Sequence, residues 1–155
     1  MKKLCLSLIV AILVSWVSLC QAAGLVVVSH TQISIEMWKI TYSWTSDSVA
    51  STIPAKASPS ISGIIFLVES TPGAAVAPTD NYTITITKEM TDSNTLDIMG
   101  ATMTANQSSS AAASYQPTGC GSSYCLVNGP ITLNVSGNSV VSATGTVTVY
   151  YLRTP

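Results

Sequence analysis

The sequence has few charged residues, a single histidine and a single phenylalanine. Charged residues make up 8% of its 155 positions, with six Lys and Arg against seven Asp and Glu. A protein that neutralises nucleic-acid phosphates needs a basic surface, so this balance argues against nucleic acid as a partner. The 47% share of hydrophobic residues excludes a disordered chain, and the length predicts one domain, with or without a tail.

The sequence also lacks the residue groups that carry catalysis. His30 is the only histidine, which nearly excludes histidine-based triads and multi-histidine metal sites. The seven acids are scattered, so they point to no pair of glycosidase carboxylates, and no D-x-D-x-D-G calcium loop is present. We therefore predict a protein that is not an enzyme, with no catalytic residue, no metal site and no cofactor.

Residues 1–23 have the layout of a secretory signal peptide. Two lysines precede the uncharged apolar run 4–19, and small residues follow it. The run is shorter than the roughly 20 apolar residues of a spanning helix. We predict cleavage after Ala22 or Ala23 and export to the periplasm or the extracellular space. Lipidation of Cys20 and an uncleaved anchor remain alternatives, and either would tie the chain to a membrane through its N-terminus.

Residues 24–155 form a mildly acidic, Ser/Thr-rich remainder, which we predict to be a single domain. It keeps four basic and seven acidic residues, a net charge of −3, and 39 of its 132 residues are Ser or Thr. Its two cysteines, Cys120 and Cys125, have the spacing C-x4-C. In an exported protein such a pair predicts a disulfide, worth about 2 kcal/mol because the loop is small. A redox or metal pair is the alternative, although further metal ligands are scarce.

Alternation of apolar and polar residues predicts seven to eight strands joined by turns and loops. The expected fold is all-β, an antiparallel β-sandwich or jelly-roll-like variant. Between Met37 and Trp38 the apolar residues change from odd to even positions, which indicates a bulge or a break in the strand. The apolar run 61–69 suits a strand buried on both faces. We expect 105–124 to be a long Ser/Ala/Gly loop with one helical turn near 110–113. The strand candidates are 25–28, 33–45, 61–69, 82–87, 95–99, 126–127 with 130–136, 140–141 and 145–152.

Trp38, Tyr42 and Trp44 share one face of a predicted strand. Such an aromatic stripe belongs to the core or to a subunit interface, or it offers a stacking platform for a glycan. His30, at the end of an apolar run, is expected at the surface or in an interface.

A turn motif precedes the most regular strand candidate, 82–87. We interpret Asp80 as a turn cap that accepts local backbone N–H groups. Its alternative role is a calcium ligand together with Asp92 or Asp97. The motif consists of Pro78, Thr79, Asp80, Asn81 and Tyr82.

From about Ile40 onward the chain resembles a family of small structural proteins encoded in tailed-bacteriophage genomes. The resemblance covers about three quarters of the chain, and its most specific part is the segment 72–82, which reads PG…PTDNY. The matching segments are 40–47, 61–64, 71–74, 77–85, 96–101, 104–107, 128–135 and 142–151.

The resemblance implies a non-enzymatic virion protein that associates with copies of itself or with other structural proteins. Three features depart from the family pattern: Gln107 stands where Arg usually follows Ala-Asn, the insert with Cys120 and Cys125 is untypical, and family members normally lack a signal peptide. An exported adhesin or carbohydrate-binding module, with a glycan as partner, is therefore kept as the alternative function.

Overall fold

The computed structural model describes residues 23–90 and 94–154. Residues 1–22 of the predicted signal peptide, Cys20 among them, lie outside the described residues, and so does Asp92.

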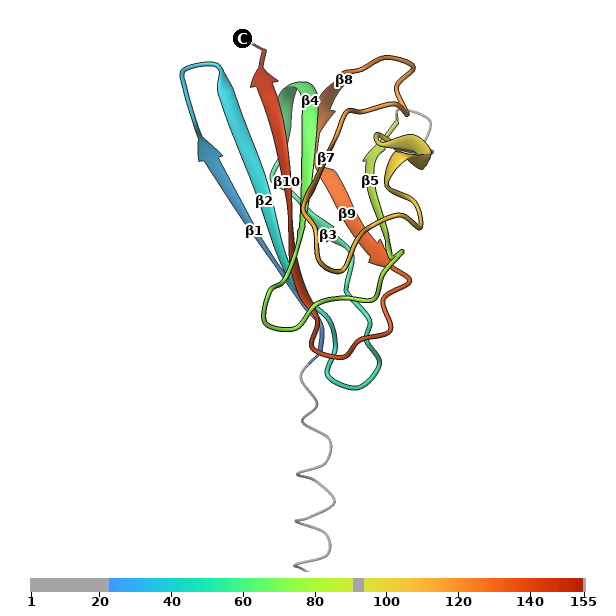
Figure 1. Ribbon diagram of the computed structural model, residues 1–155. Helices are drawn as coiled ribbons and strands as arrows, with labels where there is room; N and C mark the ends of the chain where they lie inside the picture. Colours follow the sequence, from blue (N-terminus) through green and yellow to red (C-terminus); the bar gives the residue numbers. More distant parts are fainter. Residues whose placement is uncertain (1–22, 91–93, 155) are drawn as a thin grey trace, which may run out of the picture.

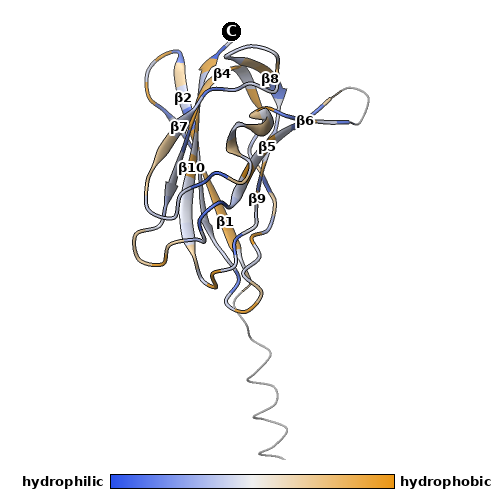
Figure 2. Cartoon of the chain, turned by 45° about the vertical axis from the view of Figure 1, so that its right-hand side comes forward, coloured by the Kyte–Doolittle hydropathy of each residue, from blue (hydrophilic) through white to orange (hydrophobic). Residues whose placement is uncertain are grey.

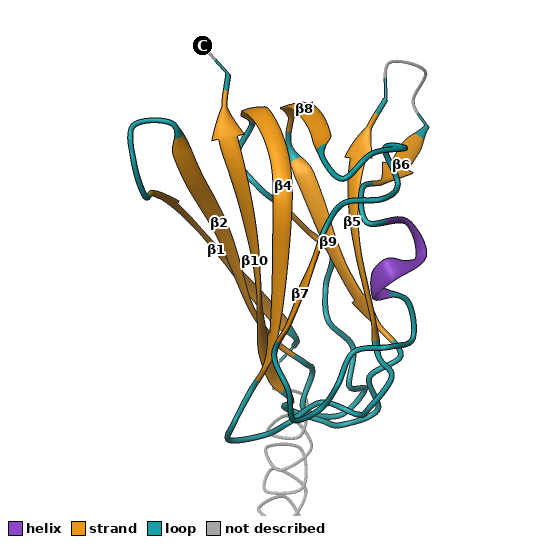
Figure 3. Cartoon of the chain, turned by 45° about the horizontal axis from the view of Figure 1, so that its top comes forward, coloured by secondary structure: helices purple, strands orange, loops and turns teal. Residues whose placement is uncertain are grey.

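The fold is all-β, as the alternation of apolar and polar residues predicts (Figures 1 and 3). Its strands are paired antiparallel throughout, in two sheets. The described part holds ten strands, more than the seven to eight expected, and one short 3-10 helix. The strands are β1 (Leu25–Gln32), β2 (Met37–Thr45), β3 (Lys56–Ala57), β4 (Ile61–Pro72), β5 (Thr83–Glu89), β6 (Thr95–Asp97), β7 (Ala113–Tyr115), β8 (Cys125–Gly129), β9 (Ile131–Ser136) and β10 (Thr144–Arg153), and the helix is η1 (Gly100–Met103).

The larger sheet is curled and has the order β1-β2-β10-β4, after which two short strands share the far edge of β4. β8 pairs with the first part of β4 and β7 with the second. Opposite β10, the register shifts so that Phe66 is an extra residue in β4. Such a bulge bends a strand, and it explains why Ile65 and Val68 both face the core despite their odd spacing.

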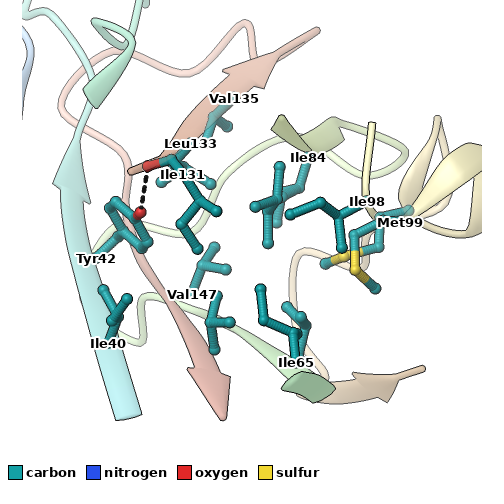
Figure 4. Close-up of a cluster of buried hydrophobic side chains, with 14 of the residues drawn as sticks. Ile40, Tyr42, Ile65, Ile84, Ile98, Met99, Ile131, Leu133, Val135 and Val147 are labelled. Atoms are coloured by element: carbon teal, nitrogen blue, oxygen red, sulfur yellow. Dashed lines mark hydrogen bonds between the residues drawn. The ribbon is translucent and has the colours of Figure 1, made fainter. Parts of the chain in front are cut away.

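The smaller sheet, β3-β9-β5-β6, covers part of the inner face of the larger one. Its inward side chains come from alternate positions of β5 and β9, and they meet those of β2, β4 and β10 in one buried cluster. Figure 4 shows Tyr42 and Ile65 of the larger sheet directed toward Ile84 and Ile131 of the smaller one. Burial of this apolar surface is the main stabilising contribution to the fold.

The predicted strand 33–45 is wrong in its first four residues. β1 continues to Gln32, and 33–36 form the connection to β2, closed by a bond from the Ile33 amide to the Met37 carbonyl at 2.8 Å. Ile35 is consequently 87% exposed. The change from odd to even positions does mark a break, but the break is a hairpin connection and not a bulge.

Two predicted loops contain strands. β3 lies between the strand candidates 33–45 and 61–69, where a connection was expected, and β7 lies within the expected loop 105–124. No helical turn forms near 110–113; η1 precedes that segment, beside β5 (Figure 3). β4 is not buried on both faces either, because its outward residues are half-buried or exposed.

Candidate functional site

The aromatic stripe of β2 is divided between the core and the surface. All three side chains face the inside of the larger sheet, but Tyr42 is 0% and Trp44 2% exposed. These two belong to the core, which excludes a glycan platform made of the whole stripe. Trp38, at the beginning of β2, is half-buried and lies where the smaller sheet no longer covers the larger one.

Burial of Tyr42 is accompanied by a hydrogen bond. Its hydroxyl donates to the carbonyl of Ile131 at 2.9 Å, which links the two sheets (Figure 4). Burial raises the pKa of Tyr42 to about 12, because the phenolate would lose its hydration; a bond with Ser58 acts in the opposite direction.

Trp38 forms one wall of a cleft of about 360 Å³. The cleft lies at the end of the molecule where the β1–β2 hairpin, the C-terminal end of β10 and the beginning of β4 come together (Figure 1). Its lining residues are His30, Trp38, Ser60, Ile61, Ser62, Asn128, Tyr151 and Arg153.

His30 and Tyr151 meet above the strand that separates them. His30 belongs to β1 and Tyr151 to β10, the two neighbours of β2, and the His30 Nε2 atom lies 2.6 Å from the Tyr151 hydroxyl. Strands two apart are nearly 10 Å from one another, so the contact uses the full reach of both side chains across the curled sheet. The His30 ring also packs against Trp38, with 5.0 Å between ring centroids.

Arg153 supplies the positive charge of the cleft. Its Cζ atom lies 5.9 Å from the centroid of the Trp38 ring, a cation–π contact. Among the described residues no carboxylate forms an ion pair with its guanidinium. Burial raises the pKa of Tyr151, and the neighbouring Arg153 charge lowers it by a smaller amount.

Gly63 allows Tyr151 to lie against β4. A Cβ atom on this buried glycine would overlap the carbonyl oxygen of Leu152 and come within 2.7 Å of Tyr151 Cδ2. The position of the Tyr151 ring, and with it one wall of the cleft, therefore depends on the absence of a side chain at Gly63.

The motif 78–82 joins loops at the other end of the sandwich. The Asp80 carboxylate accepts the backbone N–H of Ser109 at 2.7 Å and also bonds the Ser109 side chain, which lowers its pKa. It therefore fastens a distant loop instead of capping its own turn. Asn81 has a positive φ of 62°, and Tyr82 is buried, with its hydroxyl 3.3 Å from Ser70 Oγ.

The two other residues of the motif belong to the same loops. Pro78 is buried. The Thr79 hydroxyl lies 2.7 Å from Ser139 Oγ and accepts the Ser139 backbone N–H at 2.9 Å. Asp97, proposed as a fellow calcium ligand, instead accepts the backbone N–H of Met99. The described part of the chain holds no group of three or more His, Cys, Asp and Glu side chains that could bind a metal.

Cys120 and Cys125 form a disulfide, with 5.5 Å between their Cα atoms. Cys125 is buried at the beginning of β8, and Cys120 packs against the core from the preceding loop. The bond therefore fastens that loop where the chain enters β8. Within the described ranges, no helix is long and apolar enough to cross a membrane.

Sequence reasoning identified Trp38 and His30 but not their partners in the cleft. Asn128, Tyr151 and Arg153 lie about 90 or more positions away from them, and the pairing of β10 with β2 brings Tyr151 opposite Trp38. The alternation of Val147, Val149, Tyr151 and Arg153 was the available signal, since it places all four on one strand face.

Comparisons with known proteins identify no family. No protein-family model and no curated protein matches the sequence. Among solved structures, a chain from the acidic stable capsid structure of Helicobacter pylori bacteriophage KHP30 matches with a TM-score of 0.27 and 12% sequence identity. The match covers 85% of this chain and 89% of that chain. At this level the likeness supports no conclusion about fold or function.

Proposed function

We propose that this protein is a non-enzymatic structural β-domain that assembles with further copies of itself through the free edge of β1. The observation that carries the proposal is the length of this edge. β1 has eight residues, and among the described residues it pairs only with β2. The strands at the other edges are much shorter: β3 has two residues, β6 and β7 three each, and β8 five.

The composition of β1 favours pairing with another strand. A free strand edge exposes backbone N–H and C=O groups, and natural proteins usually block long edges with charge, proline or bulges. β1 reads LVVVSHTQ, with no Lys, Arg, Asp, Glu or Pro. Its first half is among the most hydrophobic segments of the molecule (Figure 2).

The outer face beside this edge is also apolar. Leu25 and Val27 are 58% and 54% exposed. They line a shallow groove of about 350 Å³ together with Thr45, Thr144 and Thr146 and other residues of the larger sheet. A second β1 strand, related by a two-fold axis, would join two sheets into one and cover these side chains.

Charge introduced at the edge tests this proposal. The double substitution Val27→Lys and Ser29→Lys places lysines on exposed positions of β1 without touching the core. Like charges brought together across a strand pair cost up to about 1 kcal/mol each, so we expect self-association to weaken at least about tenfold. Sedimentation velocity of the purified protein over a range of concentrations measures this.

Thr41→Lys is the control. Thr41 lies opposite Ser29 on the same outer face, but β2 is an interior strand and Thr41 does not line the groove. This variant should associate nearly as the unmodified protein does. A protein that is monomeric at all concentrations, or one in which Thr41→Lys and the edge variant weaken association equally, would exclude the β1 edge as the interface.

The resemblance to phage structural proteins supports a place for this assembly in a virion. If the gene lies among capsid, portal and tail genes, and mass spectrometry finds the chain in purified particles, the virion role holds. Its absence from such particles would contradict that role without affecting self-association.

Export is proposed on the layout of residues 1–23. Mass spectrometry of the N-terminus of protein from the producing cells should find a chain that begins at Ala23 or Gly24. An intact Met1 would contradict cleavage. A lipid on Cys20 would show that the protein is anchored to a membrane instead of released.

A further inference from the structure

We infer that the cleft around Trp38 and Arg153 binds a sugar ring that carries a carboxylate, of the uronic-acid type. The inference is independent of the proposed assembly, since the cleft residues His30, Trp38, Tyr151 and Arg153 lie on the inner face of the larger sheet and the lysine positions of the assembly test on its outer face.

The charge in the cleft selects an anion. Arg153 is exposed, lies over the Trp38 ring and has no ion-pair partner among the described residues. A guanidinium group offers paired N–H donors whose geometry matches a carboxylate. After residue 23 the chain is acidic, with seven Asp and Glu against four Lys and Arg. Because positive charge is scarce and the cleft has one arginine, a ligand with a single negative charge suits it best.

The other polar groups suit hydroxyl groups. A sugar hydroxyl both donates and accepts hydrogen bonds, and the Asn128 amide and the Ser60 hydroxyl can do the same. Neither of these two side chains forms a hydrogen bond with another described residue. The His30–Tyr151 pair adds a third group with donor and acceptor atoms. Ser62 contributes less, because its hydroxyl is 2.9 Å from that of Thr154.

The walls of the cleft suit a ring. The aromatic and aliphatic lining consists of Trp38, Tyr151 and Ile61. Of these, the half-buried Trp38 offers a ligand most of the surface, because Tyr151 and Ile61 are 2% and 4% exposed. Aromatic side chains with one polar atom bind ligands that have both an apolar face and polar edges, as a pyranose has. The volume of about 360 Å³ lies at the small end of ligand pockets, which fits one or two sugar residues.

Binding of model glycosides to the purified protein tests the inference. The probes are methyl β-D-glucuronide, the neutral methyl β-D-glucoside, acetate and glucose 6-phosphate, each titrated while the NMR signals of the tryptophan indoles and of the Asn128 amide are followed. We expect the glucuronide to bind at least about tenfold more tightly than the glucoside, the ratio that one good carboxylate–arginine interaction supplies. The signals of Trp38 and Asn128 should shift.

Arg153→Gln should reduce the affinity for the glucuronide to that for the glucoside. The matched control is Lys56→Gln, which removes one positive charge from exposed β3, away from the cleft, and should leave the affinity unchanged. Absence of glucuronide binding, equal binding of both glycosides, or an Arg153→Gln variant that binds normally would overturn the inference. Acetate that binds as tightly as the glucuronide would show that the cleft does not recognise a sugar ring. Glucose 6-phosphate that binds more tightly than the glucuronide would show that the cleft does not prefer a ligand with a single negative charge.

Discussion

Trp44 and Tyr151 each lie against a glycine of the neighbouring strand. A Cβ atom on Gly145 would overlap Trp44 Cζ2 and come within 2.7 Å of Cε2. A Cβ atom on Gly63 would overlap the carbonyl oxygen of Leu152 and come within 2.7 Å of Tyr151 Cδ2. Gly145 is opposite Trp44 in the register of β10 and β2. β10 therefore tolerates glycine at position 145 because the Trp44 ring fills the space that a side chain would occupy, whereas at Gly63 the Leu152 backbone and the Tyr151 ring fill it together.

Gly145→Ala should consequently destabilise the fold. The added methyl group must displace a buried tryptophan ring, which costs about 1–3 kcal/mol of the free energy of unfolding. Urea denaturation measures the loss. Thr146→Ala, one position along and half-exposed, is the control and should change the free energy by less than about 0.5 kcal/mol. Equal costs for the two variants would show that Trp44 does not depend on the glycine.

The buried hydroxyl of Tyr42 makes the free energy of unfolding depend on pH in the alkaline range. Its pKa is raised from 10.0 to about 12 in the folded state. The unfolded chain therefore loses this proton first, and the contribution is complete below pH 10 and lost as pH rises toward 12. Two pH units correspond to about 2–3 kcal/mol.

Tyr42→Phe should lower the free energy of unfolding by about 1 kcal/mol at neutral pH, because the bond to the Ile131 carbonyl is lost. Between pH 10 and 12 the variant should lose less stability than the unmodified protein. Denaturation curves at several pH values measure both effects, and parallel pH profiles for the two proteins would refute the assignment to Tyr42.

At the level of elements, the far edge of β4 is divided between β7 and β8. After β7 the chain forms a loop, and the Cys120–Cys125 disulfide joins this loop to the first residue of β8. Both short strands lie along β4. The disulfide fixes this loop where the strands themselves are too short to do so.

Removal of the disulfide should cost about 2 kcal/mol, the entropy of closing a small loop in the unfolded chain. The variant Cys120→Ser with Cys125→Ala keeps an apolar residue at the buried position. Urea denaturation, and faster hydrogen exchange limited to β8 and the preceding loop, should reveal the change. Faster exchange throughout the molecule would mean that the disulfide holds the whole fold together.

The long strands were predictable, whereas the two shortest additions to the sheets, β3 and β7, were not. β5, β9 and β10 follow from alternation over six or more residues, and β4 from the continuous apolar run 61–69. β3 and β7 have two and three residues, and they form only because β9 and β4 offer an edge in the folded molecule. The connection 33–36 was missed because Ile33 and Ile35 continue the apolar alternation of a strand although they lie in a turn.

At the level of the whole molecule, one rim of the larger sheet is left uncovered by the smaller sheet. Trp38 could be singled out from the sequence, because an aromatic stripe is visible in one strand. Arg153, Tyr151 and Asn128 could not be assigned to the same site, since only the pairing of distant strands brings them together. The uncovered rim and the free edge of β1 are both products of topology, and both proposals depend on them.

Hydrogen exchange of the β1 amides at low and high protein concentration tests the proposed assembly most directly. If copies join through β1, the amides of 25–32 that point away from β2 gain protection as concentration rises, while those of β3 and β6 exchange at a constant rate. Exchange in β1 that is the same at every concentration would contradict assembly through β1.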